Sequence, residues 1–551
     1  MKLPKTDAVI VGAGAAGGVV AYELAKAGLH VVLLERGPRL EFSDTGHDEL
    51  RSQRTWVLGS AFGPDDERHI RLIGSGDPPV FRRTLPSDSG YNHVAACVGG
   101  GTKSYGAMAW RFLPQDFQMR STYGTVEGST LEDWPIRYEE LEPYYEKAEW
   151  EIGVSGDAGS NHFEGPRKKG YPTPALPFNK EARFLADAAK RRGLHPFPIP
   201  MAINSELYAE RPCCIACPHC VGFACEVHAK SSTADTVIPR AEKTGNCELR
   251  TECVAKEVLT DARGRATGVA YFQGRELIEQ PADVVIVSCS ATESPRLLLN
   301  SKSKLFPQGL GNRNDWVGRN LQGHAYSGAA AVFDEELFDG TGPAARVALC
   351  DYSHGNQGVV GGAMLANEFI RLPYLFSQRG PTPTVGRWGA AHKEFMRSYY
   401  KRSAGLKGPV QEMPVFASRV EVDDSLKDYW GIPVAKISGH RHPQDRETGR
   451  FLAERAAEIL KEAGGRDISL SLPGLGVSGG QHQAGTCRMG DDPKTSVTTK
   501  HGKLHDVDNV FVIDGSLHVT NGGFNPSLTI QALAFWCSEY LVREWKGTRF
   551  R

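Results

Sequence analysis

The chain has 551 residues, more than one ordinary domain holds, so its length indicates two or three domains. Its formal net charge is −1 at pH 7, and charge therefore gives no reason to expect nucleic acid or an anionic membrane as a partner. We find no run of about 18 consecutive apolar residues and expect no transmembrane helix.

The N-terminal residues, MKLPKTDAVIVGAG, have neither a long apolar core nor a cleavage site, and they enter a predicted strand directly. We therefore expect no signal peptide and a cytoplasmic location. Export to the periplasm alongside a partner that carries the signal is the alternative.

Residues 7–35 have the pattern of a dinucleotide-binding βαβ unit. An apolar strand-like run, 7–11, precedes a glycine-rich turn and a helical stretch, 19–28, and a second apolar run ends at Glu35. The glycines permit close approach of a pyrophosphate, the helix start offers free N–H groups, and the acid accepts ribose hydroxyls. This pattern predicts cofactor contacts from Gly12, Gly14, Ala15, Ala16, Gly17, Glu35 and Arg36.

Two further segments favour FAD over NAD. A second glycine loop, 98–102, suits a ligand too extended for one βαβ unit. Near the C-terminus, a strand-like run ends at Asp514 and Gly515, and a helical pattern follows Asn525. We expect Asn525 to be the N-cap of that helix and Pro526 its first residue, so that the positive end of the helix stabilises a reduced flavin.

Five of the twelve cysteines lie in CCIACPHCVGFAC, residues 213–225. The spacing of Cys214, Cys217, Cys220 and Cys225 is of the type that serves iron–sulfur clusters and zinc. A disulfide and a plain thiol-rich loop are the other interpretations.

Together these segments resemble the glucose-methanol-choline (GMC) oxidoreductase family over nearly the whole chain. The resemblance rests on VGAGAAGG with Glu35, VGGGT, SATESPRLLLNS (290–301), HQAGTCRMG (482–490), VFVIDGS and NPSLT (525–529). It is closest to bacterial sugar and sugar-acid dehydrogenases, including the flavoprotein subunits of gluconate and fructose dehydrogenases, with pyranose oxidases more distant.

The resemblance implies an α/β fold with a discontinuous Rossmann-type FAD domain and an interleaved, mainly antiparallel α+β substrate domain. We expect the FAD domain at 1–45, 85–135, 212–312 and 475–551, and the substrate domain at 136–211 and 313–474. Tyr105 stands where relatives have Asn or a flavin-linking His, which predicts non-covalent FAD. The further cofactor contacts implied are Gly99, Gly100, Gly101, Thr102, Tyr105, Gly106, Cys253, Val254, Asp514, Gly515, Asn525, Pro526 and Thr529.

Oxidising an alcohol requires a base for the hydroxyl proton and an acceptor, flavin N5, for the hydride. The resemblance places the base at His482 and its substrate-orienting partner at Asn525; His505 and His518 are nearby rivals. In some relatives a cysteine-rich insertion ligates a cluster that passes electrons to a cytochrome, so an acceptor protein or small subunit is an expected partner.

The expected substrate is a sugar, polyol, glycoside or amino sugar, with electrons passing to a protein or dye-like acceptor or to O2. Two other readings stay open. One is a lyase that keeps the flavin as a structural group, and the other is an electron-transfer or assembly subunit of a larger complex.

Overall fold

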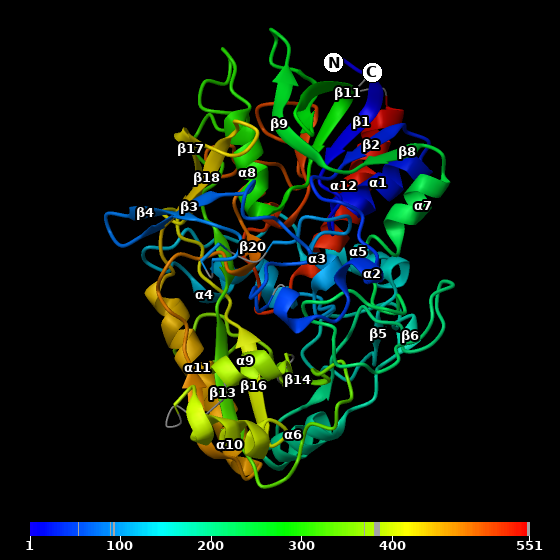
Figure 1. Ribbon diagram of the computed structural model, residues 1–551. Helices are drawn as coiled ribbons and strands as arrows, with labels where there is room; N and C mark the ends of the chain where they lie inside the picture. The colour runs from blue at the N-terminus through cyan, green and yellow to red at the C-terminus, as the bar shows by residue number, and fades with distance from the viewer. Residues whose placement is uncertain (53, 89, 92–93, 368–369, 380–385, 548–551) are drawn as a thin grey trace.

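A seven-stranded sheet near the two termini draws its strands from distant parts of the chain (Figure 1). The computed structural model describes residues 1–52, 54–88, 90–91, 94–367, 370–379 and 386–547. The strands are β1 (Thr6–Val11), β2 (Val31–Leu34), β8 (Cys247–Arg250), β9 (Cys253–Thr260), β10 (Ala266–Gln273), β11 (Glu276–Val287) and β21 (Val510–Val512). β8, β2, β1, β11 and β21 run parallel, as the nucleotide-binding pattern of the first residues predicts.

Strand β11 joins two kinds of pairing. Its first half pairs antiparallel with β10, from Glu276 to Pro281, and its second half pairs parallel with β1, from Ala282 to Val287. The apolar residues of β1 are almost completely buried, as expected for a parallel strand covered on both faces. Helices α1 (Gly17–Lys26) and α12 (Ser527–Lys546) pack together beside this sheet, α7 (Val237–Lys243) packs on α1, and α5 (Tyr138–Ile152) packs on α12.

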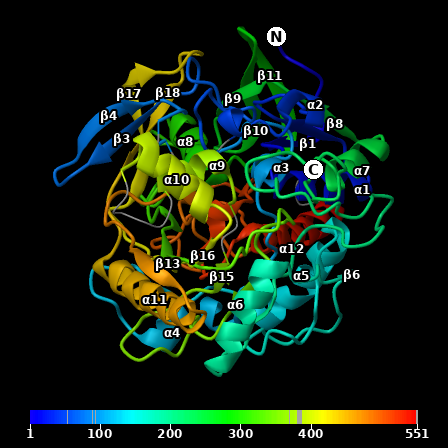
Figure 2. The ribbon, with the colours of Figure 1, turned by 60° about the horizontal axis from the view of Figure 1, so that its bottom comes forward.

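A second sheet is antiparallel throughout and lies at the opposite end of the molecule (Figures 1 and 2). Its strands, in order, are β19 (Arg466–Ser471), β13 (Tyr326–Val332), β16 (Ser403–Pro409), β15 (Leu365–Asn367), β14 (Val347–Leu349) and β7 (Phe197–Pro198). Helix α11 (Pro443–Glu462) buries Leu452, Ala456 and Ile459 against it, and α6 (Lys180–Arg191) covers its other end. The two sheets confirm the predicted fold class.

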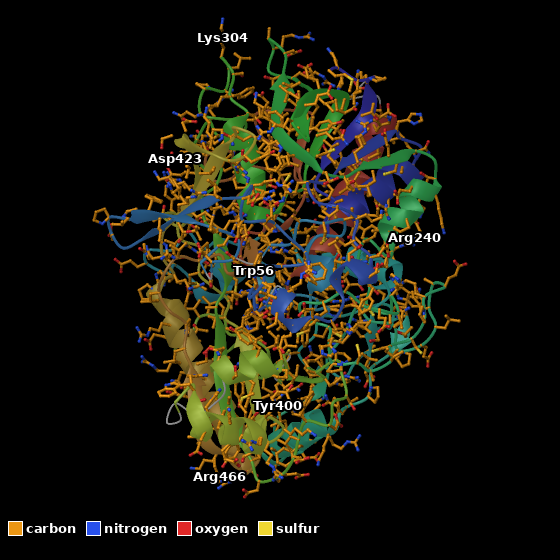
Figure 3. All side chains as sticks on the ribbon, in the orientation of Figure 1. Trp56, Arg240, Lys304, Tyr400, Asp423 and Arg466 are labelled. Atoms are coloured by element: carbon orange, nitrogen blue, oxygen red, sulfur yellow. The ribbon has the colours of Figure 1, made fainter. Side chains whose placement is uncertain are left out.

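A third sheet of four strands flanks the molecule. It contains β17 (Arg419–Lys427), β18 (Pro433–Ser438), β3 (Arg71–Ser75) and β4 (Val80–Thr84). β17 and β18 form a hairpin whose turn lies at Asp428–Gly431. Side chains fill the space between the sheets along the whole long axis, from Lys304 at one end to Arg466 at the other (Figure 3).

A two-stranded pair near the centre of the molecule connects the two large sheets. β12 (Gln322–His324) precedes β13, and β20 (Gln481–Ala484) leads toward the C-terminal part of the first sheet (Figure 1). Their antiparallel pairing places His324 beside Gln481. This pair therefore brings residues about 160 positions apart to one point, which the site uses.

The remaining elements are short. They are α2 (Phe42–Thr45), η1 (Glu49–Arg51), α3 (Gly101–Ser104), η2 (Pro114–Phe117), α4 (Met119–Tyr123), β5 (Ser155–Gly156), β6 (Thr173–Pro174), α8 (Ser290–Asn300), α9 (Pro373–Arg379), α10 (Gly389–Tyr399) and η3 (Gly515–Leu517). Within the described part of the chain, no helix has both the length and the apolar character needed to cross a bilayer.

Candidate active site

The turn between β1 and α1 forms a cradle with an acid at its base. Gly12 has φ +104°, a backbone conformation that would be strained in a residue with a side chain. Glu35 accepts hydrogen bonds from the N–H groups of Ala13 and Gly37, both at 3.0 Å. Glu35 is buried, and burial raises its pKa even though the amide donors oppose the shift. The carboxylate thus fixes the glycine turn and faces the cavity from its floor.

The glycines of the cradle do different things. A Cβ added at Gly14 or Gly101 would meet no atom within 4 Å, so at these positions the backbone faces open space that a ligand can fill. At Gly17 a Cβ would lie 1.9 Å from the carbonyl oxygen of Gly12, and at Gly99 it would lie 2.5 Å from Ser232 Oγ. Gly17 and Gly99 therefore permit close packing behind the cradle and do not line it.

One cavity of about 340 Å³ extends from this cradle to the centre of the molecule. Of the predicted cofactor contacts, it is lined by Gly12, Gly14, Ala15, Ala16, Glu35, Arg36, Gly100, Gly101, Thr102, Tyr105, Gly106, Cys253, Val254, Asp514, Gly515, Asn525 and Pro526. Thr529 does not line it, because its hydroxyl is buried against Tyr145 Oη at 2.8 Å. The cradle, its acid and this long cavity together fit an extended dinucleotide.

At the inner end of the cavity, His482 lies beside Asn525. His482 Nε2 is 3.3 Å from Asn525 Nδ2, and Asn525 Oδ1 accepts a hydrogen bond from the Trp110 indole at 3.0 Å. An indole N–H can only donate, so the amide oxygen faces Trp110 and the amide nitrogen faces both His482 and the Tyr326 hydroxyl, at 3.1 Å. His482 Nε2 must therefore accept, and its lone pair points to the Asn525 amide nitrogen.

The backbone at His482 is held in an uncommon conformation, with φ +62°. Asn521 Nδ2 donates to the His482 carbonyl oxygen at 2.7 Å, which helps to hold it. Burial lowers the pKa of His482 well below its usual value, and the neighbouring His324 and the cation of Arg54 lower it further. The imidazole is accordingly neutral near pH 7, the state that accepts a proton.

The prediction that Asn525 is the N-cap of α12 is wrong. Pro526 occupies the cap position, no side chain caps the helix, and α12 begins at Ser527. The Asn525 side chain is instead directed to Trp110, through its oxygen, and to Tyr326 and His482, through its nitrogen. Of the two rival histidines, His505 bonds to Ser496 on a loop, and His518 is buried against Phe112 and Trp134; neither lines the cavity.

The sequence prediction missed four residues of this site. His324 Nδ1 lies 2.9 Å from His482 Nδ1, Arg54 and Tyr326 line the cavity, and Trp110 orients Asn525. No local pattern marks them, because each reaches the site through long-range pairing. The VGGGT motif, which ends eight residues before Trp110, was the nearest signal.

The four cysteines of the predicted metal set surround a second, smaller cavity. Cys214, Cys217, Cys220 and Cys225 all line it, together with His219. All twelve cysteines are unpaired, so the disulfide interpretation is not seen. Within the described residues, no three His, Cys, Asp or Glu side chains are close enough to bind one metal ion. Burial raises the pKa of Cys220 to about 12.

The cysteine loop packs directly behind the wall of the main cavity. Gly222 N–H donates to the Ser104 carbonyl oxygen at 2.7 Å. The buried Lys230 ammonium donates to carbonyl oxygens on both sides, to Tyr105 at 3.0 Å and to Cys220 at 2.7 Å. Tyr105 lines the main cavity and Cys220 lines the smaller one, so the two cavities share this wall.

A dinucleotide cradle that ends at a neutral imidazole and an oriented amide defines an oxidoreductase of hydroxyl groups. Sequence models of the GMC oxidoreductase family match residues 6–326 and 414–534. The chain therefore belongs to the GMC oxidoreductase family, and it is a flavoprotein enzyme.

Known proteins similar to this chain are dehydrogenases and oxidases. It is 29% identical to the gluconate 2-dehydrogenase flavoprotein of Pantoea cypripedii, over 98% of this chain and 94% of that protein. It is 31% identical to the 2-methyl-1,2-propanediol dehydrogenase of Mycolicibacterium austroafricanum (98% and 95%) and to the 6'''-hydroxyparomomycin C oxidase of Streptomyces lividus (97% and 91%). The solved structure of pyridoxine 4-oxidase from Mesorbium loti matches with a TM-score of 0.65 at 20% identity, covering 97% of this chain and 99% of that one, and shows the same fold.

Proposed function

We propose that the protein uses non-covalent FAD to oxidise a hydroxyl group of a neutral or acidic polyhydroxy compound to a carbonyl. The observation that carries this proposal is the His482–Asn525 pair, an imidazole acceptor and an amide donor that lie 3.3 Å apart and both line the cavity. The dehydrogenase and oxidase names of the relatives support the reaction class.

His482 and Asn525 would have different roles toward the substrate hydroxyl. A substrate hydroxyl between the two side chains replaces the hydrogen bond between Asn525 and His482. It donates its hydrogen to His482 Nε2, which takes the proton, and it accepts from Asn525 Nδ2, which orients it. As the C=O bond forms, the hydrogen on the same carbon leaves with its electron pair. FAD, which the glycine cradle and Glu35 would hold, would supply the acceptor for that hydride.

The charge of the cavity favours a neutral or anionic substrate over an amino sugar. Arg54 places a cation near His482. The carboxylates that line the cavity already have partners within the protein. Glu35 accepts from two backbone amides, and Asp514 accepts from Ser290, Ser294 and Ser516. Glu293 forms ion pairs with Arg36, Arg71 and Arg296, and Asp428 forms one with Arg296. A cationic substrate would meet like charge at this end.

Anaerobic mixing of the FAD-loaded protein with a panel of polyols, sugar acids and amino sugars tests this proposal. We expect one neutral or acidic compound to bleach the flavin, and His482→Ala to slow that reduction about 10²–10⁴-fold while FAD stays bound. His505→Ala is the matched control and should keep the wild-type rate. An unchanged reduction rate in His482→Ala would remove this base from the mechanism.

We also propose that Cys214, Cys217, Cys220 and Cys225 ligate an iron–sulfur cluster that passes electrons to a protein acceptor. The four thiols line one small cavity, and cysteine thiolates are the usual ligands of iron–sulfur clusters. The wall that the two cavities share, at Tyr105 and Lys230, would lie between the flavin and the cluster.

Iron and acid-labile sulfide in anaerobically purified protein test the cluster. We expect both, and expect Cys220→Ser to lose them while flavin reduction by substrate continues. Cys247→Ser, on β8 in the first sheet, is the control and should retain the iron. Protein free of iron after anaerobic purification would make the loop a structural feature and favour O2 as acceptor.

A further inference from the structure

A second imidazole stands directly behind the proposed base. His324 is 3% exposed, and its Nε2 lies 2.8 Å from the carbonyl oxygen of Gly522 and 3.1 Å from that of Asn521. Carbonyl oxygens only accept hydrogen bonds, so Nε2 of His324 carries a hydrogen. A neutral imidazole has one N–H, and Nδ1 of His324 is therefore an acceptor.

This assignment dictates the state of His482. The two Nδ1 atoms are 2.9 Å apart, and since His324 Nδ1 accepts, His482 Nδ1 must donate. The ring hydrogen of His482 is thereby held at Nδ1. The ring lone pair is left at Nε2, which faces Asn525 at the cavity. Two backbone carbonyls on the loop before α12 thus set the tautomer of the base through one intervening ring.

The backbone on each side of His324, at Gly323 and Ala325, is held by hydrogen bonds to one carboxylate. The Glu412 carboxylate accepts the N–H groups of Gly323 at 3.1 Å and Ala325 at 2.8 Å, and it pairs with Arg441 at 2.6 Å. The charged and titratable groups that influence the imidazole pair are Glu412, Arg441, Arg54 and, against His324, His518. Burial lowers the pKa of His324, and the negative charge of Glu412 acts in the opposite direction.

We propose that His324 is a positioning residue that holds His482 in its Nδ1–H tautomer and stabilises it once it has taken the substrate proton. The proton moves from the hydroxyl oxygen to His482 Nε2, and the Nδ1–H of the resulting cation remains donated to His324, as a stronger, charge-assisted bond. This inference rests on the proposed role of His482 as base.

Two substitutions of His324 separate this role from mere packing. In His324→Asn, the side-chain oxygen can stand where Nδ1 stands and accept from His482, while the donor to Gly522 is lost. In His324→Gln, the amide can reach Gly522, but no acceptor faces His482. If His324 acts only in packing, both variants should lower the rate of flavin reduction to a similar extent, whereas the proposal predicts different rates for the two variants.

We expect stopped-flow reduction of bound FAD to stay within about 10-fold of wild type in His324→Asn and to fall about 10²-fold or more in His324→Gln, at equal FAD content and substrate affinity. Equal rates in the two variants would overturn the proposal. If His482→Ala also keeps the wild-type rate, the proposed function fails as well; if it loses reduction, only the role of His324 fails.

Nitrogen-15 spectra of histidine-labelled, FAD-loaded wild type need no variant of His324 to fold. With the His482 signals assigned by their loss in His482→Ala, we expect Nδ1 to be protonated and Nε2 not, near pH 7. The reverse assignment would overturn the proposal even if both His324 variants were inactive.

Discussion

The amide of Asn525 should control the proton affinity of the base beside it. In Asn525→Asp a carboxylate oxygen replaces the Nδ2 donor, which lies 3.3 Å from His482 Nε2, and its negative charge stabilises the imidazolium. Because an adjacent opposite charge raises the pKa of an imidazole, the acid limb of flavin reduction should move up by about one pH unit or more. In wild type the lowered pKa of His482 places this limb below pH 6.5.

Stopped-flow measurement of flavin reduction between pH 4.5 and 8 gives the acid limb of wild type and that of Asn525→Asp. Asn525→Leu is the matched control: it removes the same donor without a charge, so its rate should fall with no upward movement of the limb. Coincident limbs in Asn525→Asp and wild type would show that this amide does not act on His482.

At the scale of single residues, the sequence was informative where a motif surrounds a residue. The segment HQAGTCRMG gives His482, and NPSLT gives Asn525. The role of Asn525 as a helix cap was wrong, because a cap preference counts only neighbours in sequence, whereas Trp110 and Tyr326 come from afar. His324 could not be found, since only the β12–β20 pair brings it to His482.

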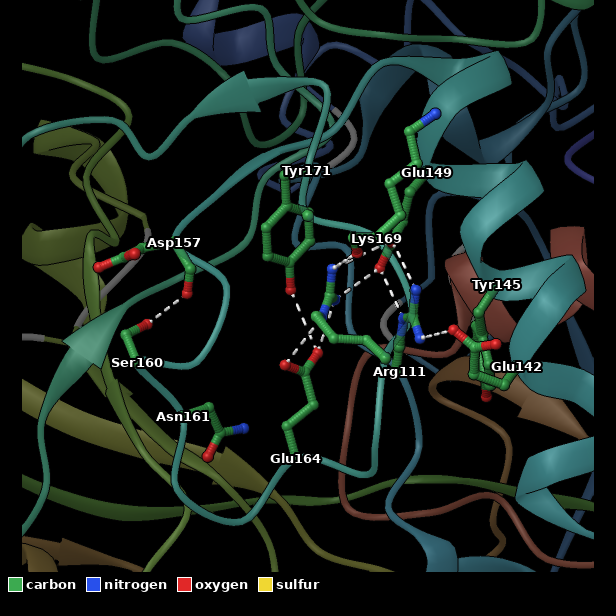
Figure 4. A network of polar contacts seen from close by, with 12 residues as sticks. Arg111, Glu142, Tyr145, Glu149, Asp157, Ser160, Asn161, Glu164, Lys169 and Tyr171 are labelled. Carbon is green, nitrogen blue, oxygen red and sulfur yellow. Dashed lines mark hydrogen bonds and ion pairs between the residues drawn. The ribbon is translucent and has the colours of Figure 1, made fainter.

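A buried ion network supports the segment that carries Trp110 (Figure 4). Arg111 donates to both oxygens of Glu149, each at 2.8 Å, and to Glu142 at 3.2 Å. Arg167, from the loop between α5 and α6, donates to Glu149 at 3.0 Å and to Glu164 at 2.8 Å. Helix α5 and this loop thereby hold the chain next to Trp110, and so hold the orientation of Asn525.

Breaking this network on one side should cost much of the stability of the protein. Glu149→Gln leaves the Arg111 guanidinium, 1% exposed, without its main counter-ion, and we expect a loss of about 3–5 kcal/mol in the free energy of unfolding. The exposed pair of Arg450 and Glu447 on α11 offers the control: Arg450→Met should change it by less than about 1 kcal/mol. Urea denaturation of the FAD-loaded variants measures both, and similar losses in both would contradict this account.

Elements were predictable where one local signal decides them. The first βαβ unit and the C-terminal helix follow from periodicity and glycine placement. In the segment 151–180, Glu164 and Arg167 join the network with Glu149, whereas Asp157, Lys168 and Lys169 are exposed. Charge in a sequence does not reveal whether its counter-ion is solvent or a side chain on another element.

The whole molecule should lose stability as the pH falls below 6.5. Burial holds the pKa of His518 at about 4 and that of His69 at about 3, so both stay neutral in the fold. The unfolded chain, with histidine pKa values near 6.5, binds protons that the folded chain does not, which favours unfolding by about 2 kcal/mol per group at pH 5. His518→Gln removes one such group.

The difference in unfolding free energy between wild type and His518→Gln isolates that group from all others that titrate. We expect the variant to gain about 2 kcal/mol relative to wild type between pH 7.5 and pH 5. His30→Gln, at an exposed position, should show no such relative gain. A constant difference across this range would mean that His518 takes up its proton over the same pH range in the folded and the unfolded chain, and would contradict this prediction.

The discontinuous arrangement as a whole came from the family resemblance and not from physical signals. β21 joins β11, and β12 joins β20, across separations that no periodicity or turn signal encodes. The sequence could predict a nucleotide cradle near Gly12; it could not show that β3 and β4 extend a sheet begun by the β17–β18 hairpin.

The sharing of one cavity between Gly12 and Asn525 has a consequence for synthesis on the ribosome. At ordinary elongation rates, roughly 30–100 s separate the emergence of these two residues. During that interval β11 can pair with β1 and β10, but its edge at Val285–Val287 waits for β21, and no complete nucleotide cavity exists. The nascent chain therefore lacks the complete FAD site while it is being made, and that strand edge stays open until release.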